Sequence, residues 1–183
     1  MKKIKNDIDT WIFDLDNTLY SADSGIFQQV HILMGKFVSK HLNIEINEAK
    51  ELQKKYYKEH GTTLRGMMDN HGVDPDLFLS EVHKLDYSIV KPNEELNKQL
   101  EKLEGRKIIY TNANRQHADD VLKKLKLDHM FTEIFDVKTA NYIPKPKIEP
   151  YKKIIKDFEI NPSKAIMFDD IAKNLVPAKK VGF

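Results

Sequence analysis

The sequence contains no cysteine and little glycine or proline. Its 183 residues include 7 Gly, 7 Pro and no Cys, which excludes a disulfide framework, a thiol nucleophile and a thiolate metal site. Glycine and proline are too scarce for a collagen-like or low-complexity chain. No stretch approaches the roughly 18 consecutive apolar residues of a membrane-spanning helix. We therefore expect a soluble globular protein.

The sequence also lacks a strong charge of either sign. With 30 Lys and Arg against 28 Asp and Glu, its formal net charge is +2. Tight binding to a nucleic acid polymer or to an anionic membrane would favour a much larger basic excess. The basic first residues, MKKIKNDIDT, are not followed by the apolar run of a signal peptide. We expect a cytoplasmic protein with neither nucleic acid nor membrane as its partner.

Short apolar runs alternate with helical patterns over most of the chain. The expected strands are 10–13, 107–111, 134–137 and 165–168, and the expected helices between them are 92–103, 117–127 and 148–158. Such alternation is typical of an α/β protein with a doubly wound parallel sheet and crossover helices. Residues 180–183 are expected to begin another strand.

One long segment interrupts this alternation. Residues 21–91 carry helical patterns alone, such as the apolar stripe from Ile26 to Val38, and Asp74-Pro75 has the pattern of a helix start. We predict an inserted all-helical cap at 21–91 and an α/β core formed by 1–20 and 92–183. A decorated single domain is the alternative.

Polar residues follow each of the four expected strands. They are Asp14, Asp16 and Thr18 after the first, Thr111 and Asn112 after the second, Lys145 after the third, and Asp169 and Asp170 after the fourth. In an open parallel sheet, ligands bind beyond the carboxyl ends of the strands. The four segments are therefore predicted to converge on one site.

The predicted site combines several carboxylates with one lysine. Clustered carboxylates repel one another, which favours a cation among them, and oxygen ligands without His or Cys favour Mg²⁺. A carboxylate-bound Mg²⁺ beside a lysine is suited to a phosphoryl group. An aspartate can itself be the nucleophile, and a second one two residues later can act as acid and then base.

These four motifs, in this order, resemble those of the haloacid dehalogenase-like hydrolase superfamily. Five longer segments are similar to the pyrimidine 5′-nucleotidase branch, which hydrolyses nucleoside monophosphates such as UMP and CMP. They are WIFDLDNTLY (11–20), YKEHGTTLRG (57–66), YTNA (110–113), YIPKP (142–146) and DIAKNL (170–175).

The resemblance implies a role for each motif residue. Asp14 is the nucleophile and forms an aspartyl-phosphate, while Asp16 protonates the leaving oxygen and then deprotonates water. Thr111 and Asn112 bind phosphoryl oxygens, and Lys145 neutralises charge. Mg²⁺ is held by Asp14, the backbone carbonyl of Asp16, and Asp169, and Asp170 holds a metal-bound water or Lys145.

Four further residues have two interpretations each. Arg65 lies in the polar break 61–66 between two cap helices and is expected to bind the pyrimidine base, with an ordinary helix-surface arginine as the alternative. His60 and His117 lie near segments that could face the site. Asn174 is either a hydrogen-bond partner behind the site or part of a helix surface.

Other functions remain open. Within the superfamily, a sugar-phosphate or phosphoglycolate-type phosphatase is the first alternative to a nucleotidase. Asp16 argues against a dehalogenase, because members of that branch lack this second aspartate. Outside the superfamily, a phospho-acceptor module pairs similar residues in another order, and a catalytically dead binding protein would not need the intact set. The base preference and the oligomeric state are not specified.

Overall fold

The computed structural model describes residues 7–131 and 133–183, which divide into two compact units. The first unit joins the chain up to Ser21 to Val90–Phe183, and the second is the segment Ala22–Ile89. Each unit is described by itself below.

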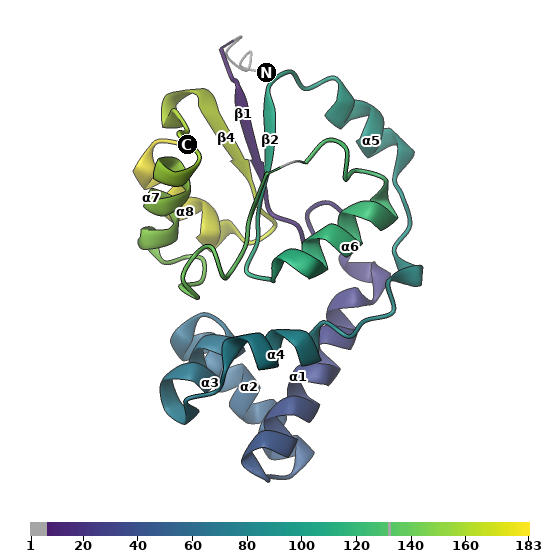
Figure 1. The fold of residues 1–183 in the computed structure, drawn as a ribbon, viewed down its shortest axis with the longest axis vertical. Coiled ribbons are helices and arrows are strands. Elements are labelled where there is room, and N and C mark those ends of the chain that lie inside the picture. Colours follow the sequence, from purple (N-terminus) through teal and green to yellow (C-terminus); the bar gives the residue numbers. More distant parts are fainter. Residues whose placement is uncertain (1–6, 132) are drawn as a thin grey trace. The chain divides into compact units, whose positions relative to one another are not determined.

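The first unit is built on a four-stranded parallel sheet. Its strands are β1 (Thr10–Phe13), β2 (Arg106–Tyr110), β3 (Glu133–Phe135) and β4 (Ala165–Phe168), in the order β3-β2-β1-β4 (Figure 1). The register pairs Ile12 with Ile108 on β2 and with Met167 on β4. All four residues of β1 are buried, as expected for a strand covered on both faces. The predicted α/β fold is confirmed.

Helices cover both faces of this sheet (Figure 1). On one side, Ile12, Ile108 and Tyr110 share a buried cluster with Tyr151 and Ile154 of α7 (Ile148–Asp157), and α8 (Ala172–Val181) completes that cluster. On the other side lie α5 (Glu94–Glu101) and α6 (Arg115–Leu125). A 3-10 turn, Pro162–Lys164, leads into β4.

The expected strand at residues 180–183 is wrong. Residues 180 and 181 continue α8, which ends at Val181. Gly182 follows with a φ of 106° and donates its backbone N–H to the carbonyls of Ala178 and Lys179. A glycine in this left-handed conformation closes a helix, so the apolar Val181 belongs to a helix face.

The second unit contains helices alone. They are α1 (Ile26–Leu42), α2 (Ile46–His60), α3 (Thr63–His71) and α4 (Pro75–Val82), with 3-10 turns at Ala22–Ser24 and Tyr87–Ile89. Asp74 caps α4 and accepts the backbone N–H of Asp76, as its sequence pattern predicted. Phe37 of α1 packs edge-on against Phe78 of α4.

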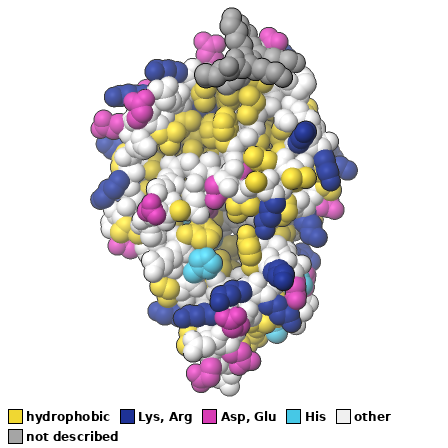
Figure 2. Space-filling model, turned by 180° about the vertical axis from the view of Figure 1, so that it is seen from behind, with side chains coloured by type: hydrophobic (Ala, Val, Ile, Leu, Met, Phe, Trp, Pro, Cys, Tyr) yellow, Lys and Arg dark blue, Asp and Glu magenta, His cyan; other side chains and the backbone are white. Residues whose placement is uncertain are grey.

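The surface carries mixed charge. Figure 2 shows Lys and Arg side chains interspersed with Asp and Glu side chains over one face, in agreement with the net charge of +2. Within the described ranges, no helix has both the length and the apolar character to span a membrane.

Gly66 of α3 generates a prediction about packing in the helical unit. A Cβ at this position would lie 2.3 Å from Cγ of Tyr56 on α2, so Gly66→Ala should force α2 and α3 apart and lower the free energy of unfolding by about 1–3 kcal/mol. Gly35→Ala is the matched control, because its Cβ would meet no atom closer than 3.6 Å. That change should stabilise α1 by up to about 1 kcal/mol. Urea denaturation followed by circular dichroism measures both, and equal effects would contradict the packing argument.

Candidate active site

The turn after β1 presents the first two aspartates. The backbone N–H of Asp14 donates to the carbonyl of Phe168, which extends the β1–β4 pairing by one residue. The carbonyl of Leu15 then accepts the N–H groups of Thr18 and Leu19. Asn17, inside this turn, has a φ of 63°. This left-handed residue turns the chain back, because Asn tolerates that conformation better than most residues do. The hydroxyl of Thr18 consequently reaches Oδ2 of Asp14 at 3.0 Å.

The ammonium of Lys145 lies between two carboxylates. Its Nζ is 2.7 Å from Oδ1 of Asp14, 2.7 Å from Oδ2 of Asp169 and 2.9 Å from the carbonyl oxygen of Tyr110. The lysine is 3% exposed. All three of its N–H donors can therefore be used inside the protein.

Burial and charge act in opposite directions on this group of residues. Burial disfavours the charged form of Lys145, but Asp14 and Asp169 outweigh it and hold the pKa of the lysine above its ordinary value. Burial, together with the charges of Asp169 and Asp16, raises the pKa of Asp14 to about 6 in spite of Lys145. The charged Lys145 thus stabilises carboxylates that would otherwise be costly to bury.

Asp169 is held from behind by the start of α8. Its Oδ1 accepts the side-chain amide of Asn174 at 2.8 Å and the backbone N–H of Ile171 at 3.0 Å. Asn174 is itself buried, and its carbonyl accepts the hydroxyl of Tyr151. The first interpretation of Asn174, as a partner behind the site, is therefore confirmed. Lys145 binds Asp169 rather than Asp170, which leaves the metal-bound water as the role expected of Asp170.

Three of the aspartates form a group that fits a cation. Asp14, Asp169 and Asp170 each offer a carboxylate oxygen, and these oxygens lie within 4.8 Å of one another. Burial and the charge of Asp169 raise the pKa of Asp170, because a neighbouring carboxylate disfavours a second negative charge. Because the donors are all oxygens, the set suits Mg²⁺ better than a softer metal. The carboxylate of Asp16 is not part of this group.

Thr111 and Asn112 follow β2 at the same edge of the sheet. The buried Thr111 places its Oγ1 3.5 Å from Oδ2 of Asp16 and accepts the N–H of Ala113 at 3.0 Å. The side-chain oxygen of Asn112 accepts the backbone N–H of Lys145 at 2.9 Å. Asn112 therefore fixes the segment that carries the lysine, in addition to its predicted role with phosphate.

Two partners of Asp16 were not assigned a role from the sequence. Nε2 of His117 and Oη of Tyr20 lie 2.8 Å and 2.5 Å from the same oxygen, Oδ1 of Asp16. The sequence alone indicates only that His117 lies near a segment that could face the site. A usable signal was present, because Asn114 is a helix-capping residue and caps α6 through the N–H of His117. That spacing puts His117 in the first turn of α6, the helix that follows Thr111 and Asn112 in the chain.

The two candidate residues of the helical segment, His60 and Arg65, lie together in the second unit. The guanidinium of Arg65 binds Asp69, with Nε 3.0 Å from Oδ2, and Nδ1 of His60 lies 3.0 Å from the same oxygen. Hydrogen bonds from Arg65 and His60 hold the pKa of Asp69 below its ordinary value. The structure thus has Arg65 in the second unit and brings the other seven predicted site residues together in the first, namely Asp14, Asp16, Thr111, Asn112, Lys145, Asp169 and Asp170.

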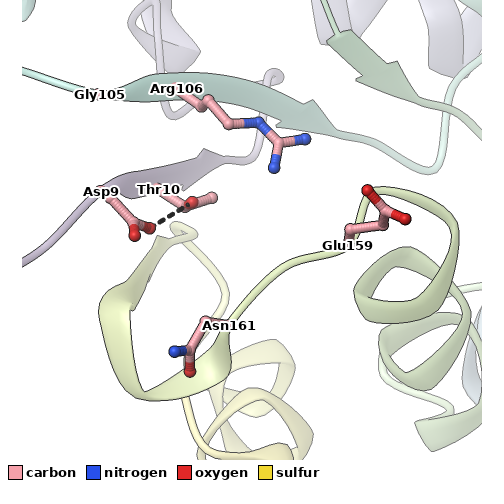
Figure 3. A pocket seen from close by; sticks show the side chains of 6 residues that line it. All are labelled: Asp9, Thr10, Gly105, Arg106, Glu159 and Asn161. Carbon is pink, nitrogen blue, oxygen red and sulfur yellow. Dashed lines mark hydrogen bonds between the residues drawn. The ribbon is translucent and has the colours of Figure 1, made fainter.

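A cavity of about 450 Å³ lies at the other end of the sheet. Figure 3 shows its lining residues at the amino ends of β1 and β2 and before β4; they are Asp9, Thr10, Gly105, Arg106, Glu159 and Asn161. The guanidinium of Arg106 there binds Glu133 at 2.7 Å. This cavity is separate from the aspartate group, which lies at the carboxyl ends.

An aspartate-rich site with a buried lysine at the carboxyl edge of a doubly wound sheet defines a class of hydrolases. The family model described as haloacid dehalogenase-like hydrolase matches residues 8–182. The chain belongs to this family, as its motifs predicted.

One curated relative is the phosphate metabolism protein 8 of Saccharomyces cerevisiae. It is 28% identical over 136 residues, which cover 68% of this chain and 42% of the relative. The chain therefore spans less than half the length of this relative.

Solved structures share the fold at low sequence identity. A hydrolase of the family from Streptococcus pneumoniae, SP0104, has a TM-score of 0.62 at 18% identity, over 97% of this chain and 82% of that one. The magnesium-bound YfnB of Bacillus subtilis has a TM-score of 0.61 at 15% identity, over 96% of this chain and 84% of that one. The L-2-haloacid dehalogenase of Xanthobacter autotrophicus has a TM-score of 0.59 at 15% identity, over 96% of this chain and 75% of that one. The fold is thus shared with a dehalogenase and with other hydrolases of the family.

The raised pKa of Asp14 predicts how stability depends on pH without metal. The folded pKa of about 6 exceeds the ordinary value of 3.8, so the folded protein retains a proton that the unfolded chain releases. The contribution of Asp14 to stability is present at low pH and is lost as the pH rises between about 4 and 6. In EDTA, wild type should lose about 2–3 kcal/mol relative to Asp14→Asn across this window. Urea denaturation at a series of pH values measures the difference, and parallel curves for the two proteins would contradict it.

Proposed function

We propose that the protein is a Mg²⁺-dependent phosphatase that hydrolyses phosphate monoesters through an aspartyl-phosphate on Asp14. The observation that carries this proposal is the position of Lys145 between Asp14 and Asp169. A buried ammonium at this place can neutralise both a carboxylate nucleophile and a phosphoryl group. Neutralising charge and positioning the reactants are the main tasks in phosphoryl transfer.

The side chains divide the reaction into two steps. In the first, Asp14 attacks phosphorus, and Asp16 gives a proton to the leaving oxygen, which departs as an alcohol. In the second, Asp16 takes a proton from water, whose oxygen attacks phosphorus and releases phosphate and Asp14. Thr111 and Asn112 donate hydrogen bonds to phosphoryl oxygens.

The carboxylates of Asp14, Asp169 and Asp170 and the backbone carbonyl of Asp16 would hold Mg²⁺. When bound, the ion supplies positive charge beside the phosphoryl oxygens. The grouping of the three carboxylate oxygens within 4.8 Å supports this assignment.

For the substrate we propose a nucleoside monophosphate, and within that class UMP or CMP. Support comes from the five segments that resemble pyrimidine 5′-nucleotidases, and the yeast relative is named for phosphate metabolism. The core residues described above bind only the phosphate, which all candidate substrates share. We assign recognition of the base to the helical unit, with Arg65 as its donor. The absence of cysteine suits a reducing cytoplasm, where we expect the protein to act.

Asp16 favours a phosphatase over a dehalogenase. A halide leaves as a stable anion and needs no proton, whereas the alkoxide of a phosphate ester does. In this chain Asp16 accepts hydrogen bonds from two side chains and lies beside Thr111, so its carboxyl is held next to a predicted phosphate contact.

Asp14→Asn tests the chemistry. It should lower phosphatase activity on UMP and on p-nitrophenyl phosphate by at least about a thousandfold, because an amide is a far weaker nucleophile. EDTA should abolish the activity of wild type, and added Mg²⁺ should restore it. An assay of phosphate release across nucleotides and sugar phosphates, with and without Mg²⁺, measures both effects. The nucleophile assignment fails if Asp14→Asn keeps activity within about tenfold of wild type.

Arg65→Ala tests the substrate assignment. Loss of a donor to the base should raise KM for UMP and CMP by about tenfold, while p-nitrophenyl phosphate, which has no base, should change little. Lys153→Ala is the matched control. Like Arg65 it removes a half-buried cation paired with an aspartate four residues later, and the exposed fractions are 34% and 35%. Equal losses on all substrates would show that Arg65 is structural, and a preference of wild type for purine nucleotides or sugar phosphates would refute the pyrimidine assignment.

A further inference from the structure

Two side chains hold the same oxygen of Asp16. Nε2 of His117 is 2.8 Å from Oδ1 and Oη of Tyr20 is 2.5 Å from it. Whether Asp16 is ionised or protonated on its other oxygen, Oδ1 can only accept hydrogen bonds, so both neighbours donate and the imidazole of His117 carries a proton on Nε2. All three residues belong to the first unit.

The other oxygen of Asp16 faces the predicted phosphate contacts. Oδ2 lies 3.5 Å from Oγ1 of Thr111, at the end of β2. With Oδ1 fixed by His117 and Tyr20, the plane of the carboxyl group is also fixed. The carboxyl therefore has one oxygen bound to two donors and one oxygen on the side of Thr111.

His117 is well suited to hold this orientation. It is 1% exposed and stands in the first turn of α6, where its backbone N–H donates to the capping residue Asn114 at 3.0 Å. Its neighbours on the buried face of α6 are apolar, among them Ala118 and Val121. A polar ring in such a place is costly unless it is hydrogen-bonded, so the bond to Asp16 also keeps the ring in position.

We propose that His117, together with Tyr20, is the positioning residue that makes Oδ2 of Asp16 the proton-transferring oxygen; this rests on the proposed phosphatase function. When the bond between phosphorus and the ester oxygen breaks, the proton on Oδ2 moves to that oxygen and an alcohol leaves. Asp16 is left as a carboxylate, whose charge on Oδ1 is stabilised by the two donors. In the second step Oδ2 takes the proton of the attacking water.

The test compares substrates whose leaving groups need acid assistance to different degrees. The kcat/KM values for UMP, phenyl phosphate and p-nitrophenyl phosphate report on formation of the phosphoenzyme and exclude its later hydrolysis. His117→Leu should lower kcat/KM for UMP by about 30–100-fold and for p-nitrophenyl phosphate by less than about fivefold, because nitrophenolate leaves without a proton.

Conservative variants separate positioning from folding. His117→Gln keeps an N–H near the place of Nε2 and should restore kcat/KM for UMP to within about fivefold of wild type. Tyr20→Phe removes only the hydroxyl. Its loss in kcat/KM should depend on the leaving group in the same way but be smaller. His129→Gln, at an exposed histidine of the same unit, is the control and should leave all values unchanged. Urea denaturation of each variant identifies any that are merely unfolded.

A double-mutant cycle with Asp16→Ala completes the test. If His117 acts through Asp16, adding His117→Leu to the Asp16→Ala variant should lower kcat/KM by less than about threefold. Additive losses, or losses equal for all leaving groups, would overturn the proposal while leaving the phosphatase function intact. If Asp16→Ala itself shows no leaving-group dependence, or wild type hydrolyses none of the three esters, the proposed function fails and the role of His117 fails with it.

Discussion

The site depends on placing one positive charge among carboxylates that water no longer stabilises. Lys145 is almost wholly buried, and both of its acidic neighbours lie 2.7 Å away. Removing one member of such a group leaves an uncompensated buried charge, which is more costly than the intact arrangement. This requirement accounts for the surrounding hydrogen bonds. Asn112 holds the backbone of Lys145, Asn174 holds Asp169, and the parallel sheet brings the segments to one edge.

The sequence was informative wherever residues act through local pattern. The four strands were recognisable because β-favouring apolar runs recur between amphipathic helices, and a parallel sheet brings their carboxyl ends to one edge. Asp14, Asp16, Lys145 and Asp169 could therefore be assigned to one site before their distances were known. The capping of α4 by Asp74 followed from a two-residue signal.

The sequence was less informative wherever a contact joins distant residues. Whether Lys145 would bind Asp169 or Asp170 depends on rotamers after β4, where Asn174 and the N–H of Ile171 fix Asp169. His117 is 101 residues from Asp16, and only the packing of α6 against the sheet brings them together. The apolar Val181 fits the pattern of a strand as well as that of a helix. In the structure it ends α8, which the left-handed Gly182 closes.

Thr18 links the first and last motifs through a single hydroxyl, whose orientation responds to the charge of Asp14. Its Oγ1 accepts the backbone N–H of Asp170 at 3.2 Å and donates to Oδ2 of Asp14 at 3.0 Å. An amide N–H cannot become an acceptor, so one lone pair of Thr18 stays on Asp170, and the hydroxyl has one proton and one further lone pair for Asp14. When Asp14 is ionised, the hydroxyl proton points to Oδ2; when Oδ2 carries a proton, the hydroxyl must rotate and accept it instead. The charge of the first aspartate is therefore coupled, through one rotating hydroxyl, to the segment that carries the last motif.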